Sequence, residues 1–394
     1  MKSGEAVPGH HEQPEMNVKM PRIPNACFLP LLLVSATAVA REVKLPPLPA
    51  GAKLEFKEDW SGGGIDSKRW YVPRKKWGQG NAGVSPENVS VAQDVVAGKE
   101  KQVLVCQANG DLYEGPVKGY DGARGRVGGI LVTRGFFASG RYEVVMKIGG
   151  MDKHDGGPDD PMRPKGAVPA VWTYGYRYVS VPKDGMDLFH ASEPLYNPWM
   201  KAYGDGVNEY WTELDFPEFG KGGDFDHAMY NTFLQNKHQP RTFEVKPMID
   251  GQYHTLTTEW RTKLVPIAVT DAQVVEKGGF HWVQDKGVPF SSYFGNPLKR
   301  LGKDRYAVYA GDRADHYVDG VKVGENLTFV PSIAAQLTLG VWLPGWGGPA
   351  PWKQSTVSFS SVRIWQYGDE GDVRGVITQD IDDNYEADGK PVKK

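Results

Sequence analysis

The sequence contains little cysteine, no long hydrophobic run and no excess of charge of one sign. Its 394 residues include 2 cysteines and carry a formal net charge of −2. This balance provides no basic stripe for nucleic acid and no polybasic patch for a membrane surface. The motifs G-x-S-x-G, H-E-x-x-H and paired C-x-x-C are missing, and the histidines are too scattered to indicate a metal site. The sequence therefore predicts no metal or other cofactor, no nucleic-acid partner and no membrane span.

A short apolar run near the N-terminus has the features of an export signal. Residues 27–34 form this run, which follows basic residues and precedes Ala38–Val39–Ala40. The order is typical of a secretory signal peptide with an A-x-A cleavage site, and the run is too short to span a bilayer. We expect residues 1–40 to be a leader cleaved near Ala40, and the mature protein to be secreted, periplasmic or on the cell surface. Cys106 is then the only cysteine left, so no intramolecular disulfide can form.

Long helical periodicity is also missing from the main part of the chain. Its 48 glycines and 29 prolines separate short runs in which apolar and polar residues alternate, such as Arg141–Ile148, His254–Trp260 and Thr356–Trp365. Short alternating runs between turn formers predict an all-β protein, built as an antiparallel β-sandwich. We expect an extended Pro-rich linker over residues 41–53, one domain over residues 54–367 and a loose acidic tail over residues 368–394.

Three carboxylates stand close together in Trp211–Glu218, with apolar residues between them. Side chains alternate along a strand, so Glu213 and Asp215 point to one face and Glu218 would point to the other. One extra residue in a β-bulge returns Glu218 to the first face, and Pro217 suits the bulge because it has no N–H to leave unpaired. The spacing therefore predicts a row of three acids on one side of a sheet.

Such a row is suited to acid–base chemistry. Neighbouring carboxylates disfavour each other's ionisation, which raises the pKa of at least one of them. Two carboxyl groups with separated pKa values provide the nucleophile and the proton donor of glycoside hydrolysis, roughly 5–5.5 Å apart in a retaining enzyme. The alternative is an acidic, solvent-facing strand edge without chemistry, although Trp211, Leu214 and Phe216 make a poor solvated edge.

The segment Glu213–Glu218, ELDFPE, resembles the bulged E-x-D-x-x-E signature of glycoside hydrolase family 16, the laminarinase, lichenase, agarase and carrageenase group. Pro169–Trp172 resembles that family's Pro-Ala-Phe-Trp strand, while Tyr253–Trp260 and Val362–Trp365 resemble later strands in the same order. The resemblance implies a concanavalin A-like jelly roll with a concave substrate cleft. It also implies an endo-acting, retaining hydrolase of O-glycosyl bonds in a β-linked polysaccharide, a β-glucan or a β-galactan.

The same resemblance implies a role for each acid. Glu213 is expected to attack the anomeric carbon, and Glu218 to protonate the leaving oxygen and then activate water. Asp215 is expected to hydrogen-bond Glu213 and to help keep Glu218 protonated. Two alternatives stay open: a transglycosylase, in which a sugar resolves the intermediate in place of water, and a non-catalytic, lectin-like jelly roll that binds glycan.

Four further residues are candidates for substrate binding. Trp172 matches a cleft position of the family, and Trp211 begins the acidic motif. Trp346 lies in a turn rich in glycine and proline that would expose its ring. Asn231 lies on the strand that in the family commonly carries a histidine, and it offers an amide to sugar hydroxyls. Core packing is the alternative for the tryptophans, because it is their commoner fate.

Three insertions distinguish the chain from the family pattern. They cover residues 151–165, residues 176–210 and roughly residues 261–305. Insertions in a jelly roll lie on loops, and loops are where binding residues concentrate. We therefore expect the insertions to influence which polysaccharide is bound.

Overall fold

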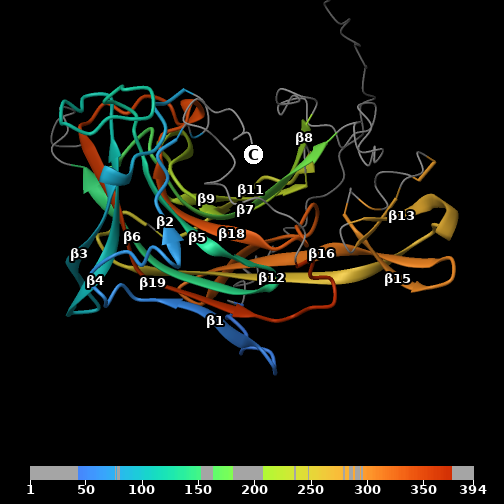
Figure 1. Ribbon diagram of the computed structural model, residues 1–394. Helices are drawn as coiled ribbons and strands as arrows, with labels where there is room; N and C mark the ends of the chain where they lie inside the picture. The colour runs from blue at the N-terminus through green and yellow to red at the C-terminus, as the bar shows by residue number, and fades with distance from the viewer. Residues whose placement is uncertain are drawn as a thin grey trace, which may run out of the picture. The chain divides into compact units, whose positions relative to one another are not determined.

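The computed structural model of the protein is a sandwich of two antiparallel β-sheets (Figure 1). All described residues belong to one structural unit. The expected leader, residues 1–40, lies outside them. Within the described part of the chain, no helix has the length and apolar character needed to cross a membrane. The structure describes residues 43–374 except 76, 78–79, 152–162, 181–206, 235–236, 247, 278–279, 284–286, 289–292 and 294–295.

The larger sheet has 11 strands, and β1 and β17 pair with β19 and β16 at its sides. Figure 1 shows it lying beneath the smaller sheet, with β12, β16 and β19 below β7 and β18. Its strands, in spatial order, are β13 (Val274–Lys277), β14 (Phe280–Val283), β15 (Leu298–Gly302), β16 (Arg305–Val318), β12 (His254–Ile267), β6 (Gly140–Met151), β19 (Gln354–Gln366), β4 (Lys99–Asn109) and β3 (Val89–Val96), with β1 (Lys53–Glu58) and β17 (Val321–Asn326).

The smaller sheet has 8 strands, and the acidic motif lies on β8 within it. Its spatial order is β10 (Lys237–His238), β9 (His227–Leu234), β8 (Val207–Glu218), β7 (Val168–Ser180), β18 (Ala335–Trp342), β5 (Gly129–Phe137) and β2 (Trp70–Tyr71), with β11 (Arg241–Glu244) paired to β9. Four 3₁₀ turns complete the described elements: η1 (Pro86–Asn88), η2 (Lys221–Gly223), η3 (Asp271–Gln273) and η5 (Gly345–Gly347).

The main core lies between the two sheets, as the alternating runs predict. Phe216 of the smaller sheet meets Tyr142 of the larger one, with ring centroids 5.4 Å apart, and Tyr142 packs on Trp260 at 5.9 Å. All three rings are buried. Since side chains alternate, the inward position of Phe216 sends its neighbours on β8 to the opposite face. The core therefore fixes which face of the smaller sheet carries the acids.

A change of register keeps the apolar side of β19 turned inward. Val357 and Phe359 are buried at odd-numbered positions, whereas Val362 and Ile364 are buried at even-numbered ones. Strict alternation along the strand would send the two pairs to opposite faces. The pairing of β19 with β6 shifts between Phe359 and Ser361. One additional residue on β19 restores the inward face after the shift, because side-chain direction has a period of two. The structure thus confirms the all-β antiparallel fold that the alternation predicts.

The third insertion is an extension of the larger sheet, which corrects the expectation of a loop. Residues 261–267 continue β12, and residues 306–313 of β16 pair with them. The strands β13, β14 and β15 then add to the same sheet, at one end of it in Figure 1. The extension has an apolar cluster of its own, which includes Trp282, Tyr306 and Val308. Apolar side chains recurring through the insertion make pairing and burial more favourable than an exposed loop.

The expected linker is bound to the domain along part of its length. The amide of Leu45 donates to the carbonyl of Gly320 at 2.8 Å, and the amide of Lys322 donates to the carbonyl of Val43 at 2.7 Å. Arg141 also donates a guanidinium N–H to the carbonyl of Pro46 at 2.7 Å. These hydrogen bonds fix the segment against β6 and against the turn between β16 and β17.

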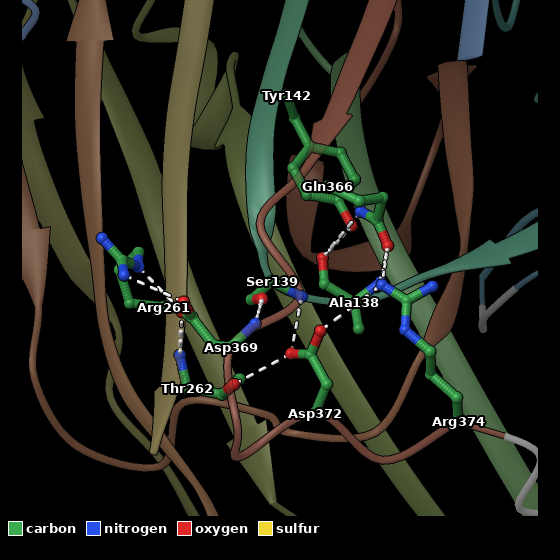
Figure 2. A network of polar contacts seen from close by, with 9 residues as sticks. All are labelled: Ala138, Ser139, Tyr142, Arg261, Thr262, Gln366, Asp369, Asp372 and Arg374. Carbon is green, nitrogen blue, oxygen red and sulfur yellow. Dashed lines mark hydrogen bonds and ion pairs between the residues drawn. The ribbon is translucent and has the colours of Figure 1, made fainter. Parts of the chain in front are cut away.

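The chain after β19 continues to pack on the domain (Figure 2). Asp369 accepts two hydrogen bonds from the guanidinium of Arg261, at 2.7 and 2.9 Å. Asp372 accepts from the amide of Ser139 at 3.1 Å and from the hydroxyl of Thr262 at 2.8 Å. The domain boundary expected at residue 367 therefore moves to at least residue 374. Acid-rich composition alone indicated a tail, but these two carboxylates have partners on distant strands.

A buried histidine links the two sheets. His316 of β16 is 0% exposed and packs against Tyr230 of β9, with ring centroids 4.2 Å apart and the rings tilted by 31°. Its Nε2 lies 2.9 Å from Oδ1 of Asn326, and its Nδ1 lies 2.9 Å from the hydroxyl of Thr258. Because the amide nitrogen of Asn326 already donates to the carbonyl of Gln239, its Oδ1 must accept from His316. The neutral imidazole therefore carries its proton on Nε2.

We expect His316 to make a contribution to the stability of the protein that is lost between pH 6.5 and pH 4. Burial lowers the pKa of His316 from 6.5 to about 4, so in this range the unfolded chain binds a proton that the folded chain does not. This contribution decreases as pH falls, by roughly 3 kcal/mol for the whole interval. Urea unfolding of wild type and His316→Gln at pH 7 and pH 4 isolates it, because the raised pKa values of the acids on β8 act in the opposite direction in both proteins. His316→Gln should be less stable at pH 7 but lose this part of the pH dependence. An unchanged pH slope in the variant would contradict the assignment.

Candidate active site

The three acids of β8 lie on one face of the smaller sheet, opposite the core. Asp215 is directly opposite Trp172 on β7 and Asn231 on β9. Glu218 is opposite Ala170 on β7 and Met229 on β9. Each neighbouring strand advances two residues between these positions, while β8 advances three. One extra residue on β8 therefore returns Glu218 to the face of Asp215, since directly opposed residues share a face.

The residues between the acids explain the local structure. Leu214 and Phe216 are buried in the core between the sheets, so Glu213 and Asp215 point away from it. The extra residue falls in the segment that contains Pro217, and the Phe216–Pro217 peptide bond is cis. Asp215 is only 3% exposed, whereas Glu213 and Glu218 are partly exposed. The middle acid is thus covered and the two outer acids are accessible.

Burial raises the pKa of all three carboxyl groups. It raises the pKa of Glu218 to about 8, with the charge of Glu213 as a further cause. It raises the pKa of Glu213 to about 7, against which the hydrogen bond from Asp215 acts. The pKa of Asp215 is well above its usual range because of burial, the charges of both neighbours and its hydrogen bond to Glu213. Near neutral pH these directions favour a protonated Asp215 and Glu218 and place the negative charge on Glu213.

An apolar surface surrounds the acids on the same face. Trp172 stands beside Asp215, and Tyr174 and Phe233 stand on either side of Glu213, from β7 and β9. His238 of β10 is opposite Phe233 and stacks on it, with ring centroids 5.2 Å apart. The apolar cluster of this face is formed by Tyr71, Val84, Ile130, Val132, Val168, Ala170 and Trp172, with Trp77, Tyr174, Phe233 and Trp342 partly buried against it.

Trp172 faces the acids but offers little surface. Its ring is 4% exposed, and Trp77 covers it edge-on with centroids 5.8 Å apart. Trp77 is itself partly exposed, so it presents more of its surface than Trp172 does. The interpretation of Trp172 as a binding residue stays a prediction. The structure adds that its ring lies beneath another tryptophan from a distant loop.

Trp346 is far more accessible than Trp172, at 46% exposure. It lies in η5, directly after β18, and packs edge-on against Trp342 with ring centroids 5.8 Å apart. Trp342 donates its indole N–H to Glu218, which opposes the rise in the pKa of that acid. The turn that carries Trp346 is therefore joined, through Trp342, to one end of the row of acids.

Asn231 and Trp211 differ in what the structure describes of them. Asn231 is buried beside Asp215, and its side-chain oxygen accepts a hydrogen bond from the amide of Thr232 at 3.0 Å. The amide group is thus on the acid face, with its oxygen directed to the backbone. Trp211 pairs with Tyr176 in the ladder between β8 and β7, and its side chain lies outside the described residues. Both stay predictions as substrate-binding residues.

No protein-family model and no curated protein sequence matches this chain. Several solved structures are similar to it along most of its length. One is a prokaryotic β-1,3-1,4-glucanase (lichenase) derived from a mouse hindgut metagenome, at 16% identity and a TM-score of 0.43, over 79% of this chain and 98% of that chain.

Two other similar structures are also of glucanases. A non-specific endo-β-1,3(4)-glucanase from glycoside hydrolase family 16 has 17% identity and a TM-score of 0.46, over 82% of this chain and 94% of that chain. The catalytic domain of an endo-1,3-β-glucanase (laminarinase) from Thermotoga petrophila has 15% identity and a TM-score of 0.45, over 80% of this chain and 98% of that chain.

Several residues of the acid face were not among the sequence candidates. Tyr174 could have been found, because it follows Trp172 at the spacing of one strand face. Phe233 could have been found in the same way, because it follows Asn231 at that spacing. Trp77 and His238 carry no such signal, since Trp77 lies in a loop and the place of His238 depends on how β10 aligns with β9. This pairing between strands is not specified by the local sequence.

Proposed function

We propose that this protein is a secreted, endo-acting, retaining glycoside hydrolase that cleaves a β-linked polysaccharide, a β-glucan or a β-galactan. One observation carries the chemical part: Glu213, Asp215 and Glu218 share a face, in surroundings that favour a charge on Glu213 and a proton on Glu218. The substrate class and endo mode are taken from the family resemblance of the ELDFPE segment. Secretion is taken from the apolar run and the Ala38–Val39–Ala40 pattern.

In the first step, the Glu213 carboxylate attacks the anomeric carbon and forms a covalent ester with the sugar. The bond from that carbon to the leaving oxygen breaks, and the leaving oxygen takes the proton of Glu218. The raised pKa of Glu218 keeps this proton available near neutral pH. The negative charge moves from Glu213 to Glu218 in this step, so the three acids together carry one negative charge before and after it.

In the second step, the Glu218 carboxylate removes a proton from water, and the water oxygen attacks the anomeric carbon. The ester bond breaks and Glu213 recovers its negative charge. Two displacements at one carbon restore the original β configuration. The hydrogen bond from Asp215 lowers the pKa of Glu213. It therefore stabilises the carboxylate both before attack and as a leaving group.

We expect the mature chain to release new reducing ends from at least one of laminarin, lichenan, agarose, porphyran and the carrageenans. The first product should be the β-anomer, because the mechanism retains configuration, and proton NMR during the reaction measures it. Glu213→Gln serves as the control, since it keeps the size of the side chain and removes the nucleophile.

Each other outcome of this screen has a definite meaning. An α-anomer formed first would contradict the retaining mechanism. Tight binding of a polysaccharide without any new reducing end would favour the lectin-like alternative. Longer oligosaccharides at high acceptor concentration, without net hydrolysis, would identify a transglycosylase.

A further inference from the structure

Arg126 joins two loops through backbone carbonyls. Its backbone is left-handed, with φ of 60°, an uncommon conformation for a residue other than glycine. Its Nε donates to the carbonyl of Gly80 at 2.8 Å. The other two nitrogens donate to carbonyls at both ends of η5, namely Leu343 at 3.1 Å, Pro344 at 2.9 Å and Gly348 at 3.0 Å.

This use of the side chain depends on the shape of the guanidinium group. Arginine presents five N–H donors in a planar fork, whereas lysine presents three from a single atom. Arg126 directs its donors to four carbonyls, and its nearest carboxylate is Asp111 at 3.5 Å. One oxygen of Asp111 accepts a hydrogen bond from Arg126 at that distance, and the other accepts from the amide of Ala350 at 2.7 Å. The side chain of Arg126 is 20% exposed. The contacts are those of a group that holds a turn in shape.

The two loops that Arg126 joins are in close contact. A Cβ atom on Gly80 would lie 2.8 Å from the Cα of Gly345, so only glycine fits there without displacement. The other neighbour of η5 is η2, the turn that begins three residues after Glu218 and packs beside it. The position of η5 thus depends on Arg126 on one side and borders the segment following Glu218 on the other.

The turn η5 is connected to Glu218 through one residue, Trp342. Trp342, the last residue of β18, donates its indole N–H to Glu218, and Trp346 of η5 packs against its ring. The charged groups that face Glu218 are Glu213 and Asp215 on β8 and Lys221 on η2. Its opposed neighbours on β7 and β9 are uncharged. Among these groups that act on Glu218, Trp342 is therefore the uncharged hydrogen-bond donor.

We propose that Arg126 is a positioning residue for Glu218: by holding both ends of η5, it keeps Trp346 against Trp342 and the indole N–H of Trp342 on the carboxyl group. The inference rests on the proposed function, in which Glu218 protonates the leaving oxygen. The leaving sugar then lies on the side of Glu218, and the exposed ring of Trp346 borders that side.

Arg126→Met tests the proposal, because methionine keeps much of the apolar stem and removes every donor. Arg124→Met is the matched control, since Arg124 is on the same loop and its one hydrogen-bond acceptor among the described residues is the carbonyl of Glu114. Trp342→Phe removes the N–H and keeps an aromatic ring. We expect Arg126→Met and Trp342→Phe to raise the pKa of Glu218, because both remove or weaken a hydrogen bond to its charged form. Arg124→Met should leave it unchanged.

The pKa of Glu218 is measured without any substrate, by ¹³C NMR titration of labelled carboxyl groups with Glu218→Gln as the assignment control. In active protein, the alkaline limb of kcat/KM on polysaccharide should move upward by about half a pH unit in the same two variants. The value of kcat/KM should fall about tenfold in Arg126→Met.

The two measurements separate this proposal from the proposed function. If wild-type protein cleaves no polysaccharide but the titration moves as expected, the positioning role stands and the function is wrong. If polysaccharide is cleaved and Glu218 titrates identically in Arg126→Met and wild type, the positioning role is wrong. A loss of thermal stability with an unmoved titration would also overturn it, because that is the effect of a purely structural arginine.

Discussion

Glu213→Ala should lose hydrolysis of the polysaccharide by about 10⁴-fold or more, the largest effect expected of any substitution in the chain. We expect no substitute for Glu213, because Asp215 is buried and the raised pKa values of Asp215 and Glu218 favour their protonated forms. Without a nucleophile, no glycosyl-enzyme forms from an ordinary substrate. Initial rates of reducing-end release measure the loss, and circular dichroism shows whether the variant is folded.

The same variant should use a glycosyl fluoride of α configuration. This compound has the anomeric configuration of the missing intermediate, so a sugar acceptor activated by Glu218 can displace fluoride directly. The product is a β-linked oligosaccharide that the variant cannot hydrolyse. Mass spectrometry detects it. If Glu213→Ala keeps ordinary hydrolysis, or if it fails with the fluoride while folded, Glu213 is not the nucleophile.

Glu218→Ala should lose hydrolysis of the polysaccharide by about 10²–10⁴-fold, the second large effect. Its defect should depend on the leaving group, because the missing proton matters only where the leaving oxygen needs one. A dinitrophenyl glycoside should still form the intermediate on Glu213, which then accumulates for lack of a base. Wild-type activity on polysaccharide should fall above about pH 8, where Glu218 loses its proton. When Glu218→Ala reacts with the dinitrophenyl glycoside, the rate of the first step should not fall above this pH.

Azide provides the decisive control for the two roles. It needs no deprotonation, so it should resolve the intermediate of Glu218→Ala and give a glycosyl azide of retained β configuration. Rescue of Glu213→Ala by azide with inversion, together with no rescue of Glu218→Ala, would show that the two roles are exchanged.

The site was predictable to the extent that it is local. Three acids in one strand, a bulge at Pro217 and apolar residues between the acids are all contained in Trp211–Glu218. Alternation acts between adjacent residues, so the face of Glu213 and Asp215 follows from the burial of Leu214 and Phe216. The same property predicted the antiparallel sandwich, because alternate apolar residues in each strand indicate which side faces the core.

Composition was a poorer guide to the acidic end of the chain and to the third insertion. Residues 368–374 have the acidity of a tail, but Asp369 and Asp372 bind Arg261, Thr262 and Ser139 from other strands (Figure 2). The insertion near residues 261–305 was expected as a loop, and it extends the larger sheet instead. The partners of Asp369 and Asp372 are distant in the sequence, so composition within that segment does not identify them.

The sequence by itself determined the all-β fold and the presence and facing of the three acids. The tertiary structure decided what surrounds them: that Trp77 covers Trp172, that Trp342 donates to Glu218, and that Arg126 holds the turn next to it. The physical reason is the range of the interactions. Side-chain direction on a strand is set by the neighbouring residue, whereas burial, hydrogen bonding and pKa depend on the register between strands and loops far apart in the chain.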